Sequence, residues 1–293
     1  MEGKYFDLSQ DATLGGDSPS TTKIPSQAAL KAYIDAKAAA VSVNYFYVED
    51  ASGSANTLTI KKNNNALPDK VFEWSLDKQN WTEITVTDTT GVSIAVPANG
   101  RVYLRGDNDS LNDSNGAYKT SLDCAYLFNV GGDLSTLIAK SGNQKTCANY
   151  CFRGFFQYST VKDASQLILP ALILSGGCYQ NLFNGCASLT AAPQLPALKL
   201  ASYCYGYMFE DCTALTSAPI LPALLVSSNG YNGMFHNCAL IDRIEIYATT
   251  WNNQNNWLNN VAATGDFYNL GGATIPTGTN GIPSGWTEHT QLP

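Results

Sequence analysis

Cysteine is the reactive residue that this sequence places most regularly. The chain holds eight cysteines, and most of them recur at matching positions, with the members of a pair eight residues apart: Cys151, Cys178, Cys186, Cys204, Cys212 and Cys238. Zinc sites usually have cysteines two to four residues apart or histidine partners. The observed spacing fits neither pattern, so we expect small buried side chains stacked in ladders and no metal site. Disulfides, formed in an oxidising medium, are the alternative.

Groups that could catalyse hydrolysis are few. The two histidines, His236 and His289, do not stand in the sequence context of an activated nucleophile or a zinc-binding helix. Polysaccharide hydrolysis uses two carboxylates, and two acidic pairs are candidates: Glu210/Asp211 and Asp242/Glu245. Carboxylates in solvated turns are the more common explanation of such pairs. We therefore predict that the chain is not an enzyme, has no catalytic residue and binds no cofactor.

Three aspartates in residues 106–118 are candidate calcium ligands, because calcium takes several hard oxygen donors. Asp107, Asp109 and Asp113 lie in a loop rich in Asn and Ser. The loop lacks the glycine and the closing glutamate of an EF-hand. We therefore predict no bound metal here.

Composition excludes two classes of partner. The chain has 293 residues and a formal net charge of −7, with 17 lysines and arginines. Nucleic-acid binding through phosphates needs clustered basic residues, so we expect no nucleic-acid partner. No apolar run approaches the roughly 18 to 20 residues that span a bilayer, and no signal peptide is visible. We expect neither membrane insertion nor export by the usual secretory route.

A period of 26 residues organises the C-terminal half. Residues 178–186 return as residues 204–212, and again in degraded form as residues 230–238, while residues 151–159 are a weaker early copy. Periods of 20 to 50 residues indicate a stacked solenoid, in which each unit buries its apolar face against its neighbours. Such a fold offers a long surface for binding.

Aromatic residues four positions apart mark each repeat, as in Tyr179/Phe183 and Tyr205/Phe209. That spacing places both rings on one face of a helical turn. Prolines in the stretches between the copies exclude helix there. We therefore expect an extended segment followed by a helical turn in each unit, with the rings in the stacking core.

Alternating residues between 43 and 107 predict a small antiparallel β-sandwich. The expected strands are Val43–Val48, Thr57–Lys61, Lys70–Ser75, Trp81–Val86, Val92–Val96 and Arg101–Arg105. Trp74 and Trp81 flank a hairpin turn. Exposed tryptophans there would bind sugars, whereas the more common role is core packing or a cross-strand pair.

An amphipathic helix is predicted near the N-terminus, after Ser26 as its N-cap. Four apolar residues share one face of it and are the candidate oligomerisation residues: Leu30, Ile34, Ala38 and Val41. Lys37 interrupts a strict heptad seam. The face would therefore form a coiled coil or pack against a neighbouring domain.

Together these elements predict a multi-domain α+β protein. Its order is an N-terminal amphipathic helix, a β-sandwich, and a stacked solenoid with a C-terminal cap. The predicted domains are residues 1–42 for attachment and oligomerisation, 43–118 for the sandwich, 119–262 for the solenoid, and 263–293 for the cap, with Trp286 as its apolar plug.

The repeat, at residues 178–197 and 204–223, resembles the BspA-type leucine-rich repeats of bacterial surface proteins and phage proteins. This resemblance implies that the solenoid at residues 119–262 is a leucine-rich-repeat solenoid. Residues 264–287 are similar to the segment that ends such arrays. Residues 73–81 and 102–107 resemble the β-domain that commonly precedes them. Residues 11–16 and 25–35 resemble the leader of phage fibre proteins, which are usually trimeric.

These resemblances imply a structural virion protein, a tail or head fibre, that adheres to the host cell surface through its repeats. The implied partners are further copies of the chain in a homotrimer or dimer, other virion proteins at the N-terminus, and a glycan or protein of the host surface. The implied location is the virion, assembled in the host cytoplasm. A bacterial cell-surface adhesin and a fibre-borne polysaccharide depolymerase are the alternatives. No ligand-binding residue is singled out by the sequence.

Overall fold

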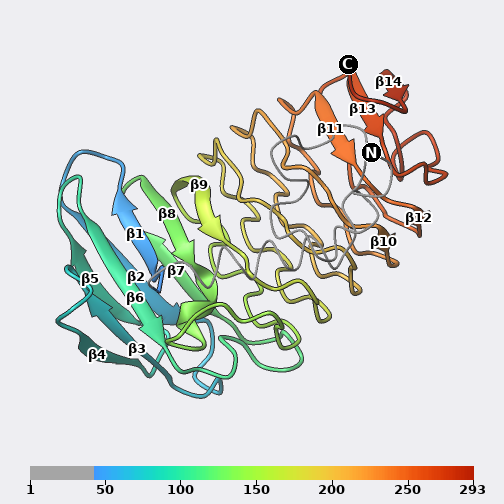
Figure 1. Cartoon of the computed structure of the whole chain (residues 1–293). Coiled ribbons are helices and arrows are strands. Elements are labelled where there is room, and N and C mark those ends of the chain that lie inside the picture. The colour runs from blue at the N-terminus through green and yellow to red at the C-terminus, as the bar shows by residue number, and fades with distance from the viewer. Residues whose placement is uncertain (1–42) are drawn as a thin grey trace, which may run out of the picture. The chain divides into compact units, whose positions relative to one another are not determined.

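The computed structural model describes residues 43–293, of which residues 45–293 form one compact unit. The predicted N-terminal domain 1–42 lies outside the described residues, and so do its helix and its oligomerisation residues Leu30, Ile34, Ala38 and Val41. In the described part, strands come first and a row of stacked coils follows as far as the C-terminus (Figure 1). The first to fourth coils are those that contain the repeat copies at residues 151–159, 178–186, 204–212 and 230–238.

Two β-sheets pack face to face in the first part. The larger sheet has the strand order β4-β3-β6-β1-β8-β9, and the smaller has the order β5-β2-β7. The strands are β1 (Phe46–Asp50), β2 (Asn56–Lys62), β3 (Lys70–Ser75), β4 (Thr82–Val86), β5 (Val92–Val96), β6 (Arg101–Gly106), β7 (Thr120–Cys124), β8 (Phe128–Asp133) and β9 (Val161–Ile168). All neighbours are antiparallel except β8 and β9, which are parallel.

Alternation decides which side chains fill the space between these sheets. In β2 every second residue is buried, including Leu58 and Ile60, because successive side chains of a strand point to opposite faces. Lys62 also points inward, and its ammonium group donates to the carbonyl of Leu67 at 2.8 Å and to the carboxylate of Asp69 at 2.9 Å. The six strands predicted between residues 43 and 105 are confirmed, with small shifts at their ends.

The sandwich extends past the predicted domain boundary at residue 118, because β7, β8 and β9 are strands of its two sheets. It also continues into the first coil without a break. The N–H of Leu122 donates to the carbonyl of Phe155 at 2.7 Å, and the rings of Phe46 and Phe156 lie 6.0 Å apart between centroids. One apolar core therefore runs from the sandwich into the coils.

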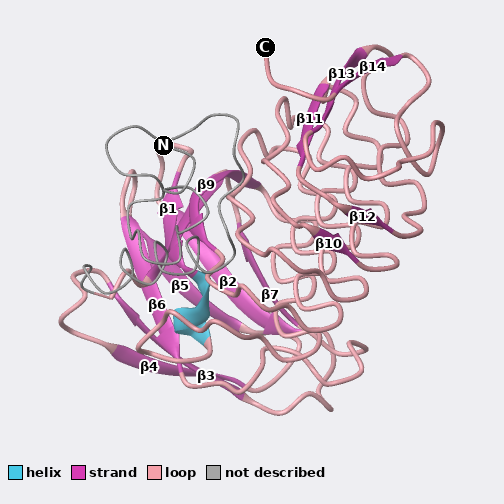
Figure 2. Cartoon of the chain, turned by 45° about the vertical axis from the view of Figure 1, so that its right-hand side comes forward, coloured by secondary structure: helices cyan, strands magenta, loops and turns pink. Residues whose placement is uncertain are grey.

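The predicted α+β fold class is wrong, because residues 43–293 are almost entirely strands, turns and loops. The only helical element described there is the short 3-10 helix η1 (Leu134–Leu137), the small cyan segment in Figure 2. The predicted leucine-rich-repeat solenoid, with a helical turn in every unit, is wrong for the same reason. Coils made of successive turns stand where those helical turns were expected.

Left-handed backbone recurs at every fourth residue of a coil. Gly177, Asn181 and Gly185 have φ values of 61°, 58° and 73°. Some backbone N–H groups close turns within the coil; that of Gln180, for example, donates to the carbonyl of Gly177. Others alternate with these and donate to the next coil; that of Asn181 donates to the carbonyl of Gly206. A turn that repeats every four residues places i and i+4 on one side, as a helix does. The aromatic spacing was therefore compatible with both structures.

Two rows of aromatic rings run through the stack, with consecutive centroids 5.2 to 6.2 Å apart and ring planes nearly parallel. One row is Phe152, Tyr179, Tyr205 and Tyr231, and the other is Phe156, Phe183, Phe209 and Phe235. All eight rings are buried, so the predicted role of the aromatic residues as stacking core is confirmed.

The last residues continue the stack in parallel. β10 (Leu225–Val226) pairs with β12 (Thr250–Trp251), β11 (Arg243–Ile246) pairs with β13 (Gly265–Asn269), and β13 pairs with β14 (Trp286–His289). Trp286 is buried, and its indole N–H donates to the carbonyl of Ala262 at 2.7 Å. Its predicted burial at this end of the apolar core is confirmed.

Candidate functional site

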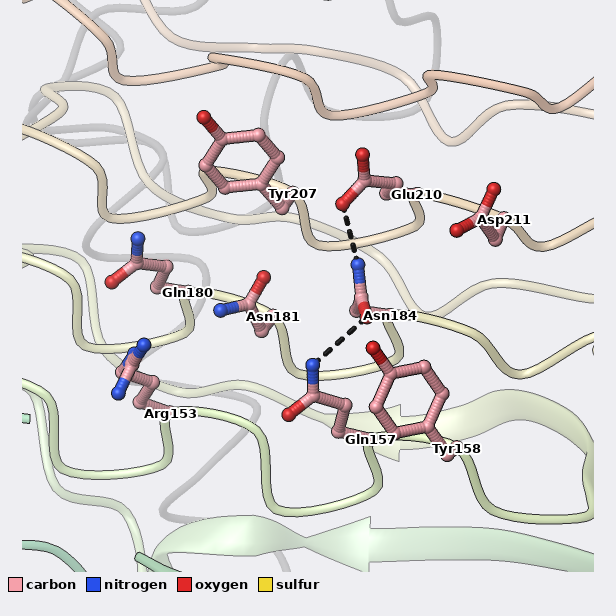
Figure 3. A pocket seen from close by; sticks show the side chains of 9 residues that line it. All are labelled: Arg153, Gln157, Tyr158, Gln180, Asn181, Asn184, Tyr207, Glu210 and Asp211. Atoms are coloured by element: carbon pink, nitrogen blue, oxygen red, sulfur yellow. Dashed lines mark hydrogen bonds between the residues drawn. The ribbon is translucent and has the colours of Figure 1, made fainter. Parts of the chain in front are cut away.

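A polar hollow of about 330 Å³ lies on the outer side of three consecutive coils. We call it the coil-face hollow (Figure 3). Each coil contributes three side chains: Arg153, Gln157 and Tyr158 from the first, Gln180, Asn181 and Asn184 from the second, and Tyr207, Glu210 and Asp211 from the third. The lining contains amides, charged groups and tyrosines and no aliphatic side chain.

The tyrosines of the hollow are placed by left-handed backbone and by glycines of the next coil. Tyr158 and Tyr207 have φ values of 63° and 56°. Their rings occupy the space that a Cβ would need at Gly185 and at Gly233, which would come closer than 3.0 Å to ring atoms. Glycine at these positions therefore lets each ring lie against the neighbouring coil. Tyr158 is 70% exposed, so most of its ring still faces solvent.

A row of hydrogen-bonded polar side chains crosses the floor of the hollow, one from each coil. Gln157 donates to the amide oxygen of Asn184 at 2.9 Å, and Asn184 donates to Glu210 Oε2 at 2.6 Å (Figure 3). Glu210 Oε1 lies 2.8 Å from Nδ1 of His236 in the fourth coil. Lys119 begins the row by donating to Gln157 Oε1. The row fixes these side chains and occupies both carboxylate oxygens of Glu210.

Two amides of the hollow have no such partner. The side chains of Gln180 and Asn181 make no hydrogen bond with any other residue between 43 and 293. Asn181 lies in a row with Gly154, which has no side chain, and with Tyr207, whose hydroxyl accepts from Asn232 at 2.6 Å. Figure 3 shows Asn181 near the middle of the hollow. These amides are thus free to bind a ligand.

Burial shifts the pKa of two groups beside this surface. Burial, reinforced by the nearby Arg153, lowers the pKa of Lys119 to about 8. Burial raises the pKa of Tyr207, so its phenol stays protonated at neutral pH. Arg153 donates to the carbonyl of Gly116 through Nη1. The charges that line the hollow are therefore one arginine against the carboxylates of Glu210 and Asp211.

Three of the four carboxylates in the predicted acidic pairs, those of Glu210, Asp211 and Glu245, bind neighbouring side chains. Asp211 accepts from the amide of Asn237 at 2.6 Å. Glu245 forms an ion pair with Arg243 at 3.4 Å, and the backbone carbonyl of Asp242 accepts a hydrogen bond from β13. The structure brings Glu210 together with His236, as described above, and His289 together with Asp266 at 2.7 Å.

Two of the three aspartates in the candidate calcium loop accept hydrogen bonds from backbone N–H groups. Asp107 accepts from the N–H of Lys140 at 3.0 Å, and Asp113 accepts from the N–H of Tyr118 at 2.9 Å. Among residues 43–293, no three His, Cys, Asp or Glu side chains are grouped so that they could hold a metal ion.

The cysteines are buried and unlinked, so the predicted ladder is confirmed. The thiols of Cys186, Cys212 and Cys238 donate to backbone carbonyls of the preceding coil at 3.0 to 3.2 Å. Burial raises the pKa of Cys186, Cys204 and Cys238 to about 12. A thiolate is the reactive form of cysteine, so these groups are unreactive at neutral pH.

A second aromatic cluster lies on the sandwich. The guanidinium carbon of Arg105 lies 3.9 Å from the ring centroid of Trp81, and the Trp81 ring packs edge-on against Tyr45. Arg105 and Lys140 both bind Glu73, whose pKa they lower. The other predicted tryptophan, Trp74, is half-buried against the core and pairs across the sheet with a threonine. The charged groups of this cluster are therefore paired with one another, whereas the coil-face hollow contains two amides without a partner.

The sequence did not single out Tyr158, Gln180 or Asn181. Their role depends on residues about 26 positions away in the neighbouring coils. The available signal was that glycine, asparagine, tyrosine and aspartate recur at every fourth position of the repeats, and these are the positions with left-handed backbone.

No helix within residues 43–293 has the length and apolar character needed to cross a membrane. Comparison of the chain with protein-family models, with curated proteins and with solved structures gives no match.

Proposed function

We propose that the chain is a virion fibre protein, on a tail or a head, that adheres to the host cell surface through its repeat coils. The observation that carries this proposal is the coil-face hollow, where free amides and an exposed tyrosine ring stand on a rigid stack. Rigid aromatic side chains give contact area at low entropic cost, and amides give adaptable hydrogen bonds. Binding sites are most effective when such groups stand on rigid elements.

Binding without catalysis fits the chemistry of the hollow. Both oxygens of Glu210 are occupied by Asn184 and His236. A glycosidase needs one carboxylic acid to protonate the leaving oxygen and a second carboxylate as base or nucleophile. Glu210 is held as a fixed acceptor and Asp211 is bound to Asn237. A fibre that bound and cut polysaccharide would release reducing ends from host surface glycan, and we expect none.

The mounting of the fibre is proposed from the sequence alone. The resemblance of residues 11–35 to phage fibre leaders supports attachment to other virion proteins at the N-terminus, and the apolar face with Leu30 and Ile34 supports a homotrimer. Light scattering on the full chain should give the trimer mass, and Leu30→Lys with Ile34→Lys should lower it. A stable monomer of the unmodified chain would contradict this part of the proposal.

The adhesion proposal is tested with the fluorescently labelled full chain and candidate host cells. We expect saturable binding that is lost when surface glycan or surface protein is stripped. Antibodies against residues 119–293 should also decorate an appendage of the purified virus particle in electron micrographs. Labelling of the particle without cell binding would leave a structural fibre that has no adhesive role. Absence of the chain from the particle would overturn the virion assignment.

A further inference from the structure

The polar groups left free in the coil-face hollow suit hydroxyl groups of a ligand. An amide offers both a donor and an acceptor, so Gln180 and Asn181 can each bind a group that also does both. Sugar hydroxyls have this property. Gln180 and Asn181 are partly exposed and adjacent in the second coil. Two neighbouring free amides would therefore engage neighbouring hydroxyls of one sugar.

The tyrosine of the first coil supplies an apolar surface in the same hollow, and Gln157 and Asn184 lie between it and these amides (Figure 3). Tyr158 is 70% exposed, and its hydroxyl makes no hydrogen bond with residues 43–293. Neighbouring strands are about 4.8 Å apart, so the coils of Tyr158 and Tyr207 are separated by roughly 10 Å along the stack. The hollow is thus long enough for roughly two linked sugars. The apolar C–H face of one sugar ring would pack on the aromatic face of Tyr158, while hydroxyls of the next sugar would reach the amides.

The charge of the hollow disfavours an acidic ligand. Its lining carries the carboxylates of Glu210 and Asp211 and the single cation of Arg153, and the whole chain has a net charge of −7. An acidic polymer would meet like charge, which costs binding energy and slows association. A cationic ligand gains little, because Glu210 is already paired on both oxygens and Asp211 on one. An uncharged ligand meets neither penalty.

The polarity of the hollow also disfavours a protein partner. The buried centre of a protein–protein interface is rich in apolar and aromatic groups and poor in charge. The hollow has no aliphatic side chain, and its two aromatic residues stand at separate coils.

We propose that the coil-face hollow binds an uncharged oligosaccharide, with Tyr158 as the stacking surface and Gln180 and Asn181 as the hydrogen-bonding groups. The inference rests on the proposed adhesive function and adds the class of ligand and the residues that bind it.

The test uses the full chain, cells to which it adheres, and polysaccharide extracted from those cells. Anion exchange separates the extract into neutral and acidic fractions, and each fraction competes against binding of the labelled chain. We expect the neutral fraction to compete and the acidic fraction not to. Competition by the acidic fraction alone, or loss of adhesion only after protease treatment of the cells, would overturn the ligand class.

Variants assign the binding to the hollow. Asn181→Gly removes the amide and keeps a residue that accepts the left-handed backbone. Tyr158→Ala removes the stacking surface. Each should weaken binding about tenfold, the effect of losing one good contact. Asn256→Gly is the matched control, because Asn256 is exposed, has a φ of 53° and lies outside the hollow.

The outcomes separate the site from the function. Failure of the unmodified chain to adhere to any cell would overturn the proposed adhesion, and this inference with it. Adhesion by the Asn181→Gly and Tyr158→Ala variants equal to that of the unmodified chain, with the variants folded by circular dichroism, would overturn the site alone.

Discussion

Gly185 and Gly272 allow the tyrosine packing at the coil-face hollow to be measured separately from backbone strain. Both glycines have a φ of 73°, so alanine suffers the same left-handed strain at each. At Gly185 the added Cβ would also collide with the ring of Tyr158, whereas at Gly272 no atom lies within 4 Å. The two substitutions therefore differ in one contact.

The magnitudes follow from the two sites. A left-handed residue other than glycine costs roughly 1 to 2 kcal/mol, and we expect that cost for both Gly185→Ala and Gly272→Ala. The Tyr158 ring must leave its position in Gly185→Ala. A side chain forced off its rotamer costs about 0.5 to 1.5 kcal/mol. We therefore expect Gly185→Ala to destabilise the full chain by about 1 kcal/mol more than Gly272→Ala.

The assay is urea unfolding followed by tryptophan fluorescence, repeated in a Tyr158→Ala background. Without the ring, the two alanine substitutions should cost the same, because the only contact that distinguishes them has been removed. Gly185→Ala should also weaken adhesion, and Gly272→Ala should not. Equal costs in the unmodified chain, or a difference that persists without Tyr158, would refute the packing argument.

Three further predictions concern the floor and the core of the stack. Glu210→Ala should lower the free energy of unfolding in urea by about 1 to 3 kcal/mol, because it leaves the buried Asn184 amide unpaired. Glu210→Gln keeps an acceptor and should lower it by less than half as much. Equal losses in the two variants would contradict the role of the hydrogen bond. Phe183→Ala should lower the free energy of unfolding by about 3 to 5 kcal/mol, since the ring is fully buried between two others. An effect near zero in calorimetry would show that the row of rings does not stabilise the stack. Burial raises the pKa of the Cys186 thiol from 9.0 to about 12, so the native state keeps a proton that the unfolded state loses; the stabilisation from this thiol is complete below about pH 9 and is lost as the pH rises towards 12. Ellman's reagent at pH 8 should therefore label the native chain slowly and the unfolded chain at all eight cysteines, and rapid labelling of the native chain would contradict the buried ladder.

The sandwich was readable from the sequence because its pattern has only one explanation. In β2, apolar side chains such as Leu58 and Ile60 alternate with exposed ones, and a period of two belongs to a strand alone. The end of the sandwich was not readable, because β9 (Val161–Ile168) lies beyond the first repeat-like segment and pairs with β8 through bulges. Long-range pairing of this kind leaves no local pattern.

The coils were mistaken for helical turns because the ring spacing of Tyr179 and Phe183 fits both. The evidence against helix was nevertheless present. Asn181 and Gly185 stand at every fourth position among those rings, and both residue types favour left-handed backbone and disfavour helix interiors. The hollow itself could not be predicted, because an amide is free or hydrogen-bonded according to which side chains the neighbouring coils place next to it. Asn184 donates to Glu210, whereas the residue at the position of Asn181 in the next coil is Tyr207, whose hydroxyl is already bound to Asn232.

Stability and recognition are carried by different positions of the same coil. Main-chain hydrogen bonds join one coil to the next, and the inward rows of rings and thiols supply the buried area. Along one outward row the left-handed residue is Tyr158, Gly185, Asp211 and Asn237 in successive coils. The backbone N–H donates to the next coil at all four, so the side chain at this position differs between coils without loss of that main-chain contact. It follows that the ligand preference of the hollow can be altered at outward positions that already carry a side chain, such as Tyr158, while the inward rows keep the stack intact.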